Sequence, residues 1–171
     1  MPSSSAKAAS IPIVYWDACV FISKIQGDPE RIDMIEELVG LAKNDKLIIV
    51  TSVITEGEVI KWPSPESTDP HPNADQLIDD FFKNPWIHRR TVDGALMGHV
   101  RRLRAAHKGL KLPDAIHVAT ALRYTVSCLH TYDHDDLIKR SGKLSLDGKS
   151  FLRIAKPDHP GRPLFNRDPD S

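Results

Sequence analysis

Residues 112–131, LPDAIHVATALRYTVSCLHT, contain the pattern that decides the fold. The proline at position 113 is typical of a helix start, and residues 113–124 are apolar on nearly every side. Residues 126–131 form a short apolar run that is typical of a β-strand. A buried helix followed directly by a buried strand indicates a parallel sheet that helices cover on both faces.

The same alternation of strand and helix patterns continues on both sides of this stretch. Apolar, β-prone runs predict strands over residues 11–16, 47–50, 86–92 and 126–131. Helical spacing, with candidate caps at Asp28-Pro29, Ser52 and Asn73, predicts helices over 28–42, 51–60, 73–84 and 94–107. Strands that alternate with helices form βαβ units, so we expect an α/β fold: a three-layer sandwich with a central parallel sheet.

Proline marks the limits of the folded unit. Residues 62–72 and 157–171 hold eight of the 13 prolines, which predicts an extended connector and a C-terminal tail. The first ten residues are small and polar, as in a flexible terminus. We therefore expect one domain over 11–157, between a flexible N-terminus at 1–10 and a proline-rich tail at 158–171.

Composition excludes several classes of protein. The 171 residues include 23 Lys and Arg and 23 Asp and Glu, which argues against a generally basic nucleic-acid coat. The only two cysteines, Cys19 and Cys128, lie in apolar stretches and fit reduced thiols better than a secreted disulfide scaffold. The sequence shows no signal-peptide pattern and no apolar run of about 20 residues, so we expect a cytoplasmic protein without a membrane span.

Four acidic residues occur where this topology would bring them together. Asp17 and Asp133 each follow a predicted strand, and Glu58 lies in the helix after the second strand. Ligands of open parallel sheets bind at the carboxyl ends of the strands. Asp114 lies in the first turn of the buried helix, where alone it would be explained by the helix dipole or as a cap.

Carboxylates that share one edge repel one another unless a cation lies between them. Mg²⁺ and Mn²⁺ prefer such all-oxygen sites, and ions of this kind support phosphodiester hydrolysis. Competing α/β activities lack their motifs, because the sequence has no G-x-G-x-x-G, no G-x-x-x-x-G-K-[ST] and no G-x-S-x-G. The sequence therefore predicts a metal-dependent phosphodiesterase.

Further residues near these acids allow two interpretations. Between positions 94 and 113 the chain has no acid and five basic residues: Arg101, Arg102, Arg104, Lys108 and Lys111. They are either a solvated helix face or a phosphate-binding strip. Glu56 and Glu58 are rotated by about 200° on a helix, so only one of them faces the metal edge. We assign Glu58 to that edge and Glu56 to solvent, and we expect His117 to be a packed or hydrogen-bonded residue and Cys19 a core residue.

Four segments taken together resemble the acidic motifs of the PIN-domain family. In chain order they are YWDACVFI (15–22), TSVITEGEV (51–59), LPDAIHVATAL (112–122) and LHTYDHDDL (129–137), and residues 154–157 are similar to the family's closing strand. The resemblance implies a Mg²⁺- or Mn²⁺-dependent endoribonuclease that is similar in size to VapC-like toxins of VapBC-type toxin–antitoxin pairs.

The same resemblance implies roles for particular residues. Carried over by position, Asp17, Glu58, Asp114 and Asp133 would bind the metal and carry catalysis, with Asp135 or Asp136 as alternatives for the fourth acid. Thr131 would orient a metal-bound water or substrate. The expected partners are an RNA substrate, a small antitoxin protein and a second copy in a homodimer. The alternative is a catalytically silent PIN-like module that binds RNA or a protein.

Overall fold

The computed structural model describes residues 10–64 and 67–160 and contains one five-stranded sheet in which every pairing is parallel. The strand order is β5-β2-β1-β6-β7. The strands are β1 (Ile13–Trp16), β2 (Ile48–Ser52), β5 (Ile87–Arg90), β6 (Cys128–His130) and β7 (Ile154–Ala155). The predicted α/β fold with a central parallel sheet is confirmed.

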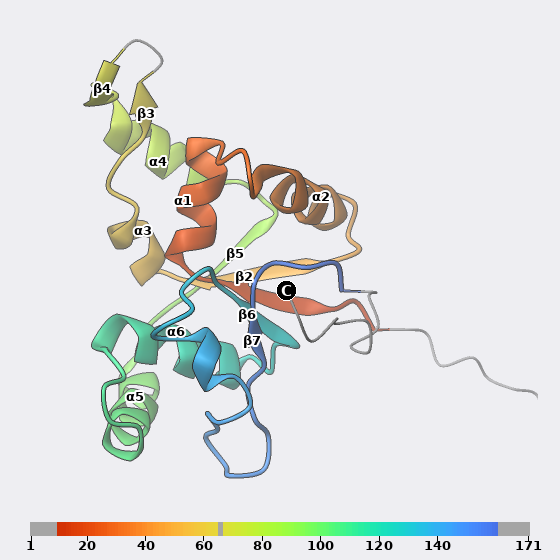
Figure 1. Cartoon of the computed structure of the whole chain (residues 1–171), viewed down its shortest axis with the longest axis vertical. Coiled ribbons are helices and arrows are strands. Elements are labelled where there is room, and N and C mark those ends of the chain that lie inside the picture. Colours follow the sequence, from red (N-terminus) through yellow and green to blue (C-terminus); the bar gives the residue numbers. More distant parts are fainter. Residues whose placement is uncertain (1–9, 65–66, 161–171) are drawn as a thin grey trace, which may run out of the picture.

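Helices cover both faces of the sheet (Figure 1). On one side lie α1 (Ala18–Gln26), α2 (Ile32–Lys43) and α4 (Ala74–Phe82), and on the other lie α5 (Gly94–Ala106) and α6 (Leu112–Arg123). Alternating side chains of β1 point to opposite faces. Val14 and Trp16 therefore pack in the core under α1 and α2, whereas Tyr15 packs in the core formed with α5 and α6.

Helix α1 was not predicted, although its ends have ordinary helix signals. Asp17 is the N-cap, since its carboxylate accepts hydrogen bonds from the backbone amides of Cys19 and Val20. Gly27 ends the helix with a φ of 62°, the left-handed conformation that glycine adopts at low cost. The consequence for function is that Asp17 has a structural role in addition to any role in binding a metal.

Three predicted helix boundaries differ from the structure. Asp28 and Pro29 lie in a turn, and α2 begins only at Ile32. Helix α4 begins at Ala74, and the side chain of Asn73 makes no capping hydrogen bond to it. The helix predicted over 51–60 is the short α3 (Ile54–Glu58), because β2 extends to Ser52.

The proline-rich segment 62–72 is a hairpin and not a plain connector. Strands β3 (Pro63–Ser64) and β4 (Ser67–Pro70) pair antiparallel, and the His71 amide donates to the Trp62 carbonyl at 2.9 Å. Trp62 packs edge-on against Phe81 of α4 at 5.9 Å between ring centroids. The hairpin extends past α4 at the end of the molecule (Figure 1).

The predicted flexible N-terminus and the C-terminal tail fall almost entirely outside the described residues. A short 3-10 helix, η1 (Ile138–Arg140), connects the end of β6 to the segment that leads into β7. Within the described part of the chain, every helix is too short or too polar to cross a membrane.

Candidate metal and nucleic-acid site

Asp17 lies at the carboxyl end of β1, the central strand of the sheet, and is only 5% exposed. Its Oδ1 accepts the amides of Cys19 at 3.1 Å and Val20 at 3.4 Å, and the Cys19 Sγ–H at 2.8 Å. Burial raises the pKa of Asp17, and nearby His117 and the hydrogen bonds to Cys19 and Thr131 oppose that rise. The structure therefore holds a buried carboxyl in a fixed orientation at this edge.

Asp114 lies half-buried in the first turn of α6. Burial raises the pKa of Asp114, His117 lowers it, and the carboxylates of Asp133 and Asp136 raise it further. Asp133 and Asp136 are therefore close enough to Asp114 to repel its charge. These neighbours show that Asp114 faces an acidic environment.

Of the three acids that follow β6, two act electrostatically on Asp114. The Asp133 carboxylate accepts the Asp136 amide at 2.9 Å, and Asp136 forms an ion pair with Lys111 that lowers the pKa of Asp136. Asp135 points into solvent with a side chain that is 95% exposed. Asp133 is the larger source of repulsion at Asp114, and its role as the fourth acid stays a prediction.

Glu56 and Glu58 point in different directions, as their spacing predicts. His117 Nε2 lies 2.8 Å from Glu58 Oε2, on the side of the buried helix α6. Glu56, which was expected to face solvent, forms an ion pair with Arg89 on the edge strand β5 at 2.9 Å. The expectation for Glu56 is corrected, since it has a cationic partner, whereas Glu58 bonds the histidine that also acts on Asp17 and Asp114.

His117 is linked to three of the four acids. It is 2% exposed, bonds Glu58 through one ring nitrogen and Tyr15 Oη through the other, and acts electrostatically on Asp17 and Asp114. The expectation of a hydrogen-bonded histidine is confirmed. Its partners were not predicted, although the position of His117 one turn after Asp114 was a signal that it faces the same edge.

Thr131 connects the two acids Asp17 and Asp133. Its side chain is fully buried, bonds the Asp17 carboxylate and accepts the Asp133 amide at 3.0 Å. These bonds fix the position of the loop after β6 relative to the end of β1. Contact of Thr131 with a metal-bound water or substrate stays a prediction.

The five basic residues of the predicted strip lie in the second half of α5 and in the loop before α6, and all are exposed. They are Arg101, Arg102, Arg104, Lys108 and Lys111. Arg104 donates to the Leu110 carbonyl, and Arg102 bonds His99. Because Lys111 pairs with Asp136, the strip reaches the acidic group directly.

The four acids are a suitable donor set for a hard cation. Their ligands are all carboxylate oxygens, which Mg²⁺ and Mn²⁺ prefer. A cation would offset the cost of burying the charges of Asp17 and Asp114 and the repulsion that Asp133 and Asp136 exert on Asp114. As they stand, within residues 10–64 and 67–160, no three His, Cys, Asp or Glu side chains are grouped closely enough to hold an ion. Binding would therefore require these side chains to close around the cation.

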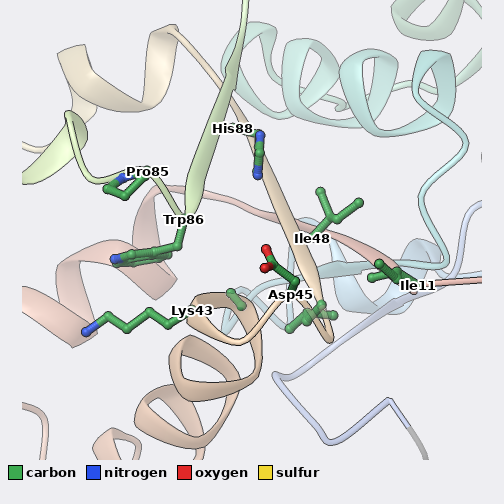
Figure 2. A pocket seen from close by; sticks show the side chains of 9 residues that line it. Ile11, Lys43, Asp45, Ile48, Pro85, Trp86 and His88 are labelled. Carbon is green, nitrogen blue, oxygen red and sulfur yellow. The ribbon is translucent and has the colours of Figure 1, made fainter.

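A separate hollow of about 340 Å³ lies at the opposite, amino-terminal edge of the sheet (Figure 2). Its lining includes Lys43 and Asp45 after α2, Ile48 at the start of β2, and Trp86 and His88 around the start of β5. Because parallel strands carry the acids at their carboxyl ends, this hollow is not part of the acidic site.

Comparison with protein families places this geometry in a known group. The PIN domain model matches residues 14–143, which is most of the chain. The chain belongs to the PIN domain family. A comparison with curated proteins gave no match.

Solved structures share the fold at low sequence identity. VapBC2 from Rickettsia felis bound to a promoter DNA fragment has 19% identity and a TM-score of 0.55, over 85% of this chain and 99% of that chain. A toxin–antitoxin complex from Klebsiella pneumoniae has 19% identity and a TM-score of 0.57, over 85% and 98%. Mycobacterium tuberculosis VapC20, a Sarcin-Ricin loop cleaving toxin, has 13% identity and a TM-score of 0.56, over 81% and 96%.

Proposed function

We propose that this PIN-domain protein is a Mg²⁺- or Mn²⁺-dependent endoribonuclease. The observation that carries the proposal is a linked set of acids from four segments: Glu58 bonds His117, His117 acts electrostatically on Asp17 and Asp114, and Asp133 acts on Asp114. Such a cluster is costly in the absence of a cation, since Asp17 and Asp114 are held where their charged forms are disfavoured.

The four acids would hold the cation, which would lower the pKa of a bound water and neutralise charge on phosphate oxygens. The chain's own residues supply positioning. Asp17 is fixed by the amides of α1 and by Thr131, and Glu58 is fixed by His117. The exposed strip from Arg101 to Lys111 would bind RNA phosphates on the way to Asp114.

We further propose that the protein is the toxin of a toxin–antitoxin pair, acts as a homodimer and is inhibited by a small antitoxin. Support comes from the similar fold and near-complete coverage of the toxin-containing structures. Apolar side chains next to the acids in sequence are exposed, Ile60 by 72% and Leu112 by 42%, which would suit burial against a protein partner. Light scattering at micromolar concentration should give a dimer, and a monomer with no inhibitory partner in a pull-down would contradict the toxin assignment.

The nuclease is tested by incubating the purified protein with a panel of structured RNAs in Mn²⁺ or in EDTA. We expect cleavage in Mn²⁺, loss of cleavage in EDTA and loss in Asp114→Asn. Asp135→Asn is the matched control, because it removes a carboxylate that points into solvent. RNA binding without cleavage, equal in Mn²⁺ and EDTA, would contradict the proposal and support the silent module.

A further inference from the structure

A chain of three hydrogen bonds runs from the backbone of β2 through the buried core to Glu58. The Ser52 amide donates to Tyr15 Oη at 3.0 Å, Tyr15 Oη lies 2.6 Å from His117 Nδ1, and His117 Nε2 lies 2.8 Å from Glu58 Oε2. Ser52 and Tyr15 are fully buried and His117 is 2% exposed. Water therefore does not compete for the first two of these bonds.

The two ends of the chain limit its directions. The Ser52 N–H can only donate, so Tyr15 Oη accepts it, and the ionised Glu58 carboxylate can only accept, so His117 Nε2 carries the N–H that donates to it. In a neutral ring with its proton on Nε2, Nδ1 accepts from the Tyr15 hydroxyl at 2.6 Å. Tyr15 therefore holds the ring with its Nε2 N–H toward Glu58.

We propose that His117, oriented by Tyr15, is a positioning residue that holds the Glu58 carboxylate ready for the cation. Glu58 needs such a positioning residue because it ends a helix of only five residues and its side chain is 32% exposed. A long side chain at such a place has several rotamers unless a rigid partner restricts it. The inference rests on the proposed metal site, and it assigns a role to two residues outside the acidic quartet.

The test uses two amides that imitate different nitrogens of the imidazole. In His117→Gln the side-chain amide can reach the position of Nε2 and keep a donor to Glu58. In His117→Asn the amide is shorter and replaces only the Nδ1 side, toward Tyr15. Isothermal titration with Mn²⁺ alone should show a weakening of about 10- to 100-fold for His117→Asn, as is typical of lost partners of metal ligands. The Mn²⁺ affinity of His117→Gln should stay within about threefold of the wild-type affinity, because the longer amide keeps a donor to Glu58.

A double-mutant cycle with Glu58→Ala separates positioning from a general effect on the fold. In the Glu58→Ala background, His117→Asn should cause no further loss of Mn²⁺ affinity. If His117→Asn does not fold, Tyr15→Phe takes its place in the cycle, since it removes the hydroxyl that orients the ring. Two results would overturn this inference and leave the proposed function standing. One is that the His117→Asn or Tyr15→Phe variant binds Mn²⁺ as tightly as the wild type. The other is that the substitution weakens Mn²⁺ binding equally with and without Glu58. Absence of Mn²⁺ binding to the wild type would overturn the proposed function as well.

Discussion

Replacement of Asp17 by asparagine or alanine separates the two roles that the structure gives this residue. The Asp17→Asn variant would keep an oxygen that accepts the Cys19 and Val20 amides, and it would remove a charge that burial disfavours. The Asp17→Ala variant would remove the charge and the cap together. Loss of a side-chain N-cap costs about 1 kcal/mol, so in EDTA Asp17→Ala should melt about 2–4 °C below Asp17→Asn in a chain of this length. Asp17→Asn should melt at or above the wild type at neutral pH.

The pH dependence of this difference has a defined sign. Because the folded pKa of Asp17 is raised above its unfolded value, the folded state binds the proton more tightly. The stabilising effect of that proton is fully present below the unfolded pKa of about 3.9 and is lost as pH rises through the folded pKa. The melting temperature of Asp17→Asn minus that of the wild type should therefore increase from about pH 4 to about pH 7, measured by circular dichroism in EDTA. A difference that decreases over this range, or an alanine variant as stable as the asparagine variant, would refute the assignment.

Three further predictions concern single side chains. Glu58→Gln should lose Mn²⁺-dependent RNA cleavage, whereas Glu56→Gln should keep it and cost well under about 1 kcal/mol in a urea titration, since its ion pair is near the surface. Arg101→Gln should weaken RNA binding and reduce the slope of log affinity against log salt by about 1, measured by filter binding at several salt concentrations. An unchanged slope would show that Arg101 does not contact RNA phosphates. Burial, together with the Asp17 carboxylate, raises the pKa of Cys19 to about 12. Iodoacetamide should therefore label Cys19 slowly at about pH 8, and faster in the Asp17→Asn variant. Rapid labelling of the wild type would show that the thiol is not held as described.

The sheet and its buried helix could be predicted because both follow from local patterns. Residues 112–131 predict a helix that is apolar on nearly every side followed by an apolar strand, which indicates a parallel sheet covered by helices. Asp17 and Asp133 each follow a strand of that sheet, and parallel strands end at the same edge. Helix α1 escaped prediction because Asp17 was considered only as an acid and not as an N-cap. The hairpin at 62–72 escaped because four prolines in a short stretch argue against paired strands.

The connections inside the site could not be predicted by local rules. The bond between Tyr15 and His117 joins residues 102 positions apart, and the bond between His117 and Glu58 joins residues 59 apart. Periodicity places such residues on a face of a strand or helix, but it does not state which atoms meet. Only the packing of α6 against the sheet brings the imidazole to Tyr15 and Glu58.

The most direct test of the carboxylate site is the affinity of the protein for Mn²⁺, measured by isothermal titration for the wild type, Asp114→Asn and Asp135→Asn. The two variants each remove one negative charge within the same region, but only Asp114 lies among the other acids. We expect saturable binding by the wild type, a loss of at least about tenfold, or about 1.4 kcal/mol, for Asp114→Asn, and unchanged affinity for Asp135→Asn. Equal losses in both variants, or a wild type that does not bind Mn²⁺, would contradict the carboxylate site.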